Sequence, residues 1–187
     1  MKKFGEELDM LCRQMYKGKE ADMFSLIERT YIGLLNNAIV RFYGEKVTTL
    51  QEFSVWKDKK LVGRADLLVR IKFDTNIVYF LFEGKQREFD GKEYLNNELE
   101  SFFGGFENQA RKYYDAEQDD YDEQVFIVPI VFEWIRTQKK LSQVLNWEKD
   151  EDDGHTDFYS VFHSNFEGDD NSGLMVYGKV VQATSYH

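Results

Sequence analysis

Cysteine, histidine and proline are scarce in this sequence, and the scarcity of the first two excludes several kinds of site. The single cysteine, Cys12, cannot form a disulfide within the chain, and nothing points to an oxidising compartment. The three histidines lie far apart at positions 155, 163 and 187. With one cysteine they do not make the ligand spacing of a structural zinc site. Nucleophile-elbow, P-loop and dinucleotide-binding glycine motifs are also missing, so serine hydrolase, NTPase and Rossmann functions lack support.

Long hydrophobic runs are absent as well. No uncharged apolar segment reaches the roughly 18 residues that a membrane-spanning helix needs. The first 14 residues, MKKFGEELDMLCRQ, contain two lysines but no apolar stretch typical of a signal peptide. We therefore expect a cytoplasmic protein with no membrane partner.

Aromatic and acidic residues are abundant instead. The 16 Phe and 11 Tyr residues can bury the apolar area that a folded core requires. The formal net charge is -10, which by itself disfavours a polyanionic partner. However, three acidic segments (115–124, 148–157 and 167–170) contain 15 of the 34 acidic residues and only one lysine. The rest of the chain is therefore basic on balance, and we interpret the acidic segments as solvated loops.

Hydrophobic periodicity predicts one α/β (α+β) domain over residues 1–187. Apolar residues recur at helical spacing from position 21 to 42, and Gly44 is a suitable helix stop. Further helices are expected near 95–117, where Gly104 and Gly105 should weaken or break the helix, and near 139–147. Strand patterns lie at 50–56, 61–73, 77–85, 125–134, 158–163 and 174–182. Short turns make the first three strands an antiparallel meander, and Pro129 predicts an edge or a bulge for the fourth.

Charged residues are placed unusually within this predicted meander. Asp66 stands among apolar neighbours in the second strand, and the apolar third strand ends in Glu83-Gly84-Lys85. Side chains alternate faces along a strand, so Glu83 and Lys85 project to the same side. A carboxylate in apolar surroundings is costly unless something neutralises it. If the two strands pair, two carboxylates and one ammonium group meet at one end of the sheet, where a divalent cation would balance them.

The order of these motifs resembles the RecB-like branch of the PD-(D/E)XK nuclease superfamily. That branch has a helix bearing a glutamate, a strand of the form G-x-h-D, a strand ending in D/E-x-K, and a helix with Q-x-x-x-Y. The corresponding residues here are Glu28, Gly63-Arg64-Ala65-Asp66, Glu83-Gly84-Lys85 and Gln109-Ala110-Arg111-Lys112-Tyr113. Glu20 is an alternative to Glu28, although Glu28 lies in the more periodic helix. The resemblance covers residues 21 to about 134, and residues 135–187 match nothing in the family pattern.

The resemblance implies a restriction-endonuclease-like core in αβββαβ order, with a central mixed sheet of about four to six strands flanked by helices. It also implies a Mg²⁺- or Mn²⁺-dependent nuclease, acting on DNA rather than RNA. Asp66, Glu83 and the main-chain carbonyl of Gly84 would bind the metal, Lys85 would orient or activate the attacking water, and Glu28 would assist. Residues expected to line the nucleic-acid groove or brace the metal site are Gln86, Gln109, Arg111, Lys112 and Tyr113.

A second function remains open from the sequence. The chain can keep the nuclease scaffold without turnover and act as a binding or regulatory protein, because a fold does not determine its function. The net charge of -10 motivates this alternative, in which the acidic loops engage a basic protein partner. A purely structural interpretation is also open, with Asp66, Glu83 and Lys85 as strand-end residues in water.

Overall fold

The computed structural model describes residues 28–57, 59–74, 76–89, 103–105, 108–109, 111–112, 124–147, 157–163 and 173–183. The helical elements are α2 (Glu28–Tyr43), the short 3-10 helix η1 (Gly44–Lys46) and α4 (Gln138–Trp147). The strands are β1 (Val47–Lys57), β2 (Lys60–Phe73), β3 (Asn76–Glu88), β4 (Gln124–Ile135), β5 (Phe158–His163), β6 (Gly173–Gly178) and β7 (Val181–Gln182). Residues 103–105, 108–109 and 111–112 are also helical, Gly104 and Gly105 included.

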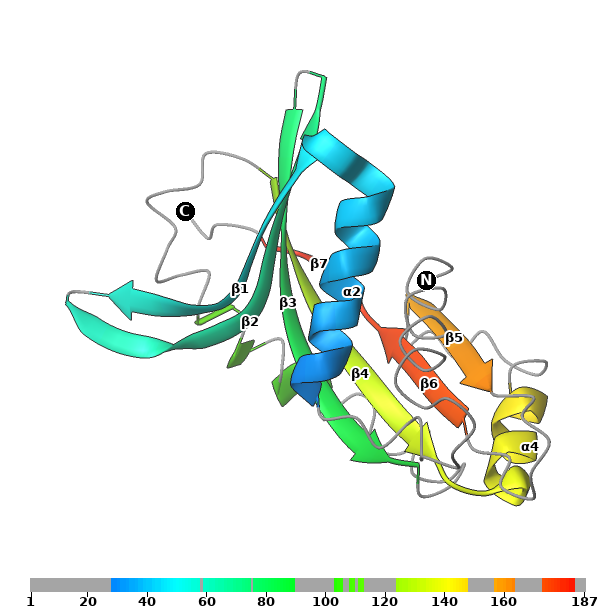
Figure 1. Ribbon diagram of the computed structural model, residues 1–187. Coiled ribbons are helices and arrows are strands. Elements are labelled where there is room, and N and C mark those ends of the chain that lie inside the picture. Colours follow the sequence, from blue (N-terminus) through cyan, green and yellow to red (C-terminus); the bar gives the residue numbers. More distant parts are fainter. Residues whose placement is uncertain are drawn as a thin grey trace.

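The described strands form one mixed seven-stranded sheet in the order β1-β2-β3-β4-β6-β5, and β7 also pairs with β4 (Figure 1). The antiparallel β1-β2-β3 meander is confirmed. β3 and β4 run parallel, and β4 then pairs antiparallel with β6 and β7. The α+β class with a mixed sheet is therefore as expected, but the sheet has more strands than predicted. Both strands predicted after position 135 are present, and the seventh strand arises because the stretch predicted as one strand at 174–182 forms two, β6 and β7.

Pro129 does not place β4 at an edge, so that prediction was wrong. β4 is central, with β3 on one side and β6 and β7 on the other. On the second side, pairing with β7 involves Phe126 and Ile127, and pairing with β6 begins at Ile130. The proline lies in the gap between these two ladders, and its carbonyl accepts a hydrogen bond from the amide of Lys179 (3.2 Å). Its missing N–H is therefore lost where no strand partner requires it.

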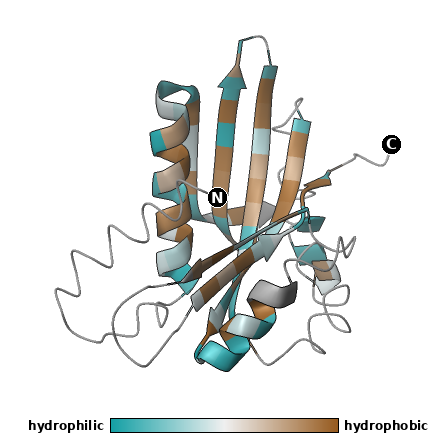
Figure 2. Cartoon of the chain, turned by 90° about the vertical axis from the view of Figure 1, so that its right-hand side faces the viewer, coloured by the Kyte–Doolittle hydropathy of each residue, from teal (hydrophilic) through white to brown (hydrophobic). Residues whose placement is uncertain are grey.

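One face of the sheet is covered by α2. The helix contributes five buried residues to the main core: Tyr31, Ile32, Leu34, Leu35 and Ala38. Tyr31 stacks on Phe132 of β4, with 5.0 Å between the ring centroids. Figure 2 shows hydrophobic residues concentrated along the strands and along part of α2. The helix ends where predicted, because Gly44 has a φ of 58° that few other residues adopt.

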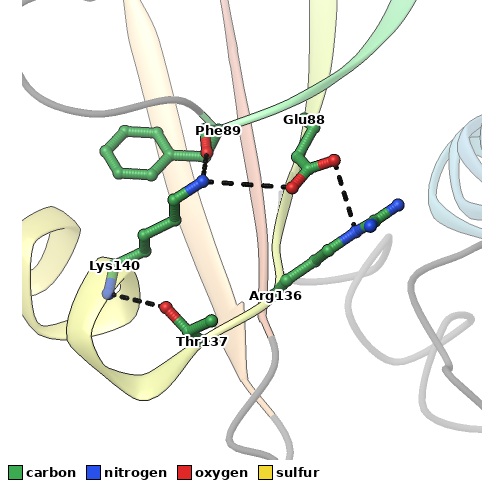
Figure 3. A network of polar contacts seen from close by, with 5 residues as sticks. All are labelled: Glu88, Phe89, Arg136, Thr137 and Lys140. Carbon is green, nitrogen blue, oxygen red and sulfur yellow. Dashed lines mark hydrogen bonds and ion pairs between the residues drawn. The ribbon is translucent and has the colours of Figure 1, made fainter.

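The opposite face of the sheet carries a second core cluster. It joins residues of β4 and β6 to α4 and to Phe103 of the helical segment at 103–105: Phe89, Phe103, Val131, Ile135, Leu141, Val144, Met175 and Tyr177. Polar contacts attach the end of β3 to α4 and the turn before it (Figure 3). The Lys140 ammonium donates to the Phe89 carbonyl (2.7 Å), and Arg136 pairs with Glu88 (3.3 Å). Within the described part of the chain, no helix is long and apolar enough to cross a membrane.

Candidate active site at a fork in the sheet

The sheet divides partway along β2 and β3, at the two predicted motifs, and not at the end of the sheet as the sequence suggested. The β2–β3 ladder runs from Phe73–Asn76 to its last pair, Leu67–Phe82. Beyond that pair, β2 continues with β1, whereas β3 continues with β4 as far as Glu88 and Trp134. Figure 1 shows β1 and β2 curving away together while β3 follows β4. We call this point of divergence the fork. Asp66 and Glu83 are the first residues beyond the last pair, one on each strand.

Beyond the fork, no described strand pairs with this edge of β3, and two carboxylates take the place of a strand there. The amide of Gly84 donates to Asp66 Oδ2 (2.7 Å), and the amide of Gln86 donates to Glu28 Oε2 (2.9 Å). Residues two apart in a strand direct their amides to the same edge, so these two bonds continue the line of the lost ladder. The fork thus fixes the two acidic side chains, Asp66 of β2 and Glu28 of α2, against β3.

The same backbone geometry places a carbonyl in the fork. In a β-strand, the N–H and the C=O of one residue point to the same edge of the strand. Because the Gly84 amide points at Asp66, the Gly84 carbonyl also faces the fork. Main-chain carbonyls are hard oxygen donors of the kind that Mg²⁺ and Ca²⁺ accept.

Glu83 is buried, with 2% of its surface exposed. The side-chain amide of Gln109 donates to Glu83 Oε1, so Gln109 contacts this strand directly. The other carboxylate oxygen, Oε2, is buried and has no hydrogen-bond partner among the described residues. Such an atom loses its solvation without compensation. Glu133 Oε2 is in the same condition, but its carboxylate forms an ion pair with Arg87.

Burial and neighbouring charges disfavour the ionised form of both Asp66 and Glu83. Burial, the negative charge of Asp66 and, more weakly, that of Glu28 raise the pKa of Glu83 to about 8, against the lowering effects of Lys85 and Gln109. The pKa of Asp66 is also raised, chiefly by burial, although the Gly84 amide and Lys85 lower it. Two acidic groups with raised pKa values and a shared cationic neighbour are typical of functional sites.

Lys85 lies two residues after Glu83 on β3 and is half-buried. Alternation along the strand places it on the same face as Glu83, as expected. Its positive charge acts on both carboxylates of the fork. The structure therefore brings together Asp66, Glu83 and Lys85, and adds Glu28 and Gln109 through hydrogen bonds.

The structure ties the remaining predicted site residues less directly to the carboxylates of the fork. Gln86 takes part through its main-chain amide, which donates a hydrogen bond to Glu28 Oε2. Arg111 and Lys112 are helical, and Lys112 is exposed. Tyr113 and the alternative helix residue Glu20 lie outside the described residues.

Gly84 has a packing role that the sequence motif does not reveal. A Cβ at this position would lie 2.8 Å from Ile32 Cδ1 and 3.5 Å from Phe132 Cε2. The absence of a side chain thus lets the first turns of α2 approach β3 closely. That approach brings Glu28 within reach of the Gln86 amide.

A groove of about 440 Å³ opens beside Asp66, lined by Glu28, Arg29, Ile32, Gln51, Glu52 and Asp66. Glu52 and Arg29 were not expected here. Glu52 adopts a φ of 48°, which is uncommon for a residue with a side chain, and the β1–β2 ladder omits its pairing with Asp66. Its carboxylate forms ion pairs with Arg29 of α2 and Arg64 of β2. No sequence pattern marks a glutamate for this backbone conformation, so only the structure identifies the cluster.

The donor set at the fork fits a small hard cation. It consists of two carboxylates, one of which has a buried oxygen without a partner, together with a carbonyl that faces them. Across the described ranges, no group of three or more His, Cys, Asp or Glu side chains is arranged to hold a metal. Mg²⁺ is usually held by only one or two protein carboxylates and keeps several waters, so this smaller set suits it. A structural zinc site would need four protein ligands.

Comparison of the chain with protein-family models, with curated proteins and with solved structures finds no match in any of the three.

Proposed function

We propose that this protein is a divalent-metal-dependent nuclease that hydrolyses phosphodiester bonds, with DNA as its expected substrate. The observation that carries the proposal is the meeting of Asp66 and buried Glu83 at the fork, where one Glu83 oxygen has no partner among the described residues. A structural role gives no reason to place two carboxylates with raised pKa values beside one another. The motif order read from the sequence supports the same assignment.

Asp66, Glu83 and the Gly84 carbonyl would hold the metal ion. When bound, Mg²⁺ or Mn²⁺ supplies charge neutralisation for a phosphodiester and lowers the pKa of a coordinated water. The Gly84 amide orients Asp66, and Gln109 orients Glu83 by donating to its Oε1. Both carboxylates are thus positioned before any ligand arrives, which reduces the reorganisation needed for binding.

Lys85 has the position and the charge of a group that acts on the reacting atoms. It shares the face of Glu83 and lowers the pKa of both carboxylates. An ammonium group here can orient the attacking water and offset the negative charge that develops on the phosphate. Glu28 acts as a positioning residue, because its carboxylate secures the Gln86 amide immediately after Lys85.

The net charge of -10 favours a second candidate, a nuclease-like scaffold that binds a basic protein and has no turnover. In that case the fork carboxylates would have no role in metal binding. The two candidates therefore differ in two measurable properties, the cleavage of nucleic acid and the effect of Asp66 and Glu83 on the affinity for Mg²⁺.

Isothermal titration and a cleavage assay together test the proposal. The full chain is titrated with Mg²⁺ and Mn²⁺ and incubated with single- and double-stranded DNA and RNA. Asp66→Asn should lose metal binding and cleavage. Lys85→Ala should keep metal binding but lose at least about 100-fold in cleavage rate, as expected when a charge-stabilising group is removed.

Asp74→Asn and Lys72→Ala are the matched controls, since both residues are exposed at the far end of the β2–β3 hairpin. Neither substitution should alter metal binding or cleavage. Wild-type protein that leaves every substrate intact with both metals would overturn the catalytic proposal. Metal binding that persists unchanged in Asp66→Asn would overturn the assignment of the site.

A further inference from the structure

The ion-pair cluster beside the fork has no part in the hydrolytic step proposed above. Arg29 belongs to the first turn of α2 and Arg64 to β2, and both guanidinium groups converge on Glu52 of β1. Arg29 and Glu52 line the groove that also exposes Asp66. Three elements of the fold thus contribute to one charged wall next to the candidate metal site.

The exposure of these side chains argues against a purely structural role. The Arg29 side chain is 70% exposed and that of Arg64 is 62% exposed, whereas Glu52 is 31% exposed. Ion pairs this exposed contribute little to stability. Glu52 nevertheless holds a left-handed backbone conformation, which costs free energy for a residue with a Cβ.

Arg29 and Arg64 together form the kind of site that binds an anion, and the Glu52 carboxylate occupies it. Arginine offers a planar set of donors that matches a phosphate group as well as a carboxylate. Arg64 Nη1 lies 3.8 Å from Glu52 Oε2, an ion pair rather than a hydrogen bond, so this contact is loose. The protein carries a net charge of -10, and a polyanion therefore needs local positive charge where it approaches the fork.

We propose that Arg29 and Arg64 bind a backbone phosphate of the nucleic acid adjacent to the phosphodiester held at the fork, and that Glu52 occupies them until that phosphate displaces it. This inference rests on the proposed nuclease function and adds the residues that position the substrate. Glu52 acts as an internal competitor, so its removal strengthens binding of nucleic acid. Arg29 and Arg64 contact the substrate without touching the metal.

Fluorescence anisotropy with a labelled 20-base-pair DNA duplex tests this inference. All variants are made in the Lys85→Ala background, which prevents cleavage, and are measured with Mg²⁺ and with EDTA over a range of salt concentrations. Arg29→Gln and Arg64→Gln should each weaken binding about 10-fold, the value expected for one lost charge-assisted contact. The double variant should also lower the salt dependence by about one unit in the log–log slope. Glu52→Gln should tighten binding about 3-fold or more.

Arg41→Gln is the matched control, because Arg41 is exposed in the last turn of the same helix, at the end away from the fork. Its affinity should remain within about twofold of the background protein, the range expected for a non-specific change of one charge. Equal effects of Arg29→Gln, Arg64→Gln and Arg41→Gln would overturn the inference, as would weaker binding in Glu52→Gln.

Titration with Mg²⁺ separates this inference from the proposed function. Glu52 and Arg29 are the weakest of the influences on the pKa of Asp66. Arg29→Gln, Arg64→Gln and Glu52→Gln should therefore each change the affinity for Mg²⁺ by no more than about threefold, whereas Asp66→Asn loses it. Loss of metal affinity in Arg29→Gln would mean that Arg29 acts through Asp66, and would overturn the phosphate contact. If the metal site itself fails, the arginine variants still report on phosphate binding in EDTA.

Discussion

Two buried glutamates on the β3–β4 part of the sheet differ in how their charge is neutralised. Glu133 of β4 is fully buried and pairs with Arg87, its register partner on β3, at 2.5 Å. Glu83, four residues before Arg87, is buried beside a second carboxylate instead. Burial raises the pKa of both groups, to about 7 for Glu133 and to about 8 for Glu83.

The causes of these pKa values explain the difference. Burial is the largest cause for both glutamates. For Glu133, the other contributions all lower the pKa: the charge and hydrogen bond of Arg87, the Tyr177 hydroxyl and the charge of Lys140. For Glu83, the second largest cause is the negative charge of Asp66, which raises it further. Glu133 has a guanidinium group of its own, whereas Asp66 and Glu83 share one ammonium group, so the fork has negative charge that an external cation would balance.

Removal of the internal cation should have the largest effect on stability. Arg87→Met leaves Glu133 buried without its partner, and breaking a buried pair typically costs about 3–5 kcal/mol. Urea unfolding at pH 8 measures the loss, which should shrink below pH 6, where Glu133 is protonated. Arg136→Met is the control. Its pair with Glu88 (Figure 3) is about half exposed and should contribute less than about 1 kcal/mol. Equal losses of stability in the two variants would show that the buried pair contributes no more than the exposed one.

Neutralisation of Glu83 should stabilise the metal-free protein. Glu83→Gln removes the repulsion with Asp66 and keeps an oxygen that can accept from Gln109. We expect a gain of about 3 kcal/mol in EDTA at pH 8, and about half of that at pH 6. The same variant should lose metal-dependent cleavage, so the gain in stability accompanies a loss of function. A lower stability of Glu83→Gln at both pH values would show that the Glu83 carboxylate is satisfied in the native protein.

The smallest expected effect is the change in the stability of the wild-type protein with pH. The folded pKa values of Glu83 and Glu133 lie above the unfolded value of 4.5, so the folded state binds more protons between them. The stability from both groups is therefore full below about pH 4.5 and is lost as the pH rises through about 7 and then about 8. From pH 6 to 7 in EDTA we expect a loss of about 2 kcal/mol, reduced to about 1 kcal/mol in Glu83→Gln. A stability that rises over this interval would contradict the raised pKa values.

Local patterns in the sequence predicted the element order and the meander correctly. Alternation of apolar and polar residues, short turns and Gly44 act over a few neighbouring residues, and these interactions are the same wherever the segment is placed. The expected closeness of Asp66 and Glu83 needed one further step, the pairing of two strands joined by a tight turn. That turn sets the register, so the chain itself specifies which residues face one another.

Contacts between distant segments were not predictable in the same way. The pairing of Arg87 with Glu133 depends on the register of the parallel β3 and β4, which a long connection joins and no turn fixes. Pro129 suggested an edge because its sequence context cannot show that the β6 and β7 ladders leave a gap at that position. Glu52 was missed because no local pattern predicts its left-handed conformation, and its partners Arg29 and Arg64 belong to other elements.

The sequence by itself determined the strands, the helix and the two acidic positions on neighbouring strands, because these follow from local periodicity and a short connection. Only the tertiary structure decided that β2 pairs with β3 from Leu67 onward and not before it, so that Asp66 and Glu28 bond the open edge of β3 and Glu83 is buried. The physical reason is that desolvation and charge repulsion depend on the whole surrounding of a group, and segments far apart in the chain supply most of that surrounding.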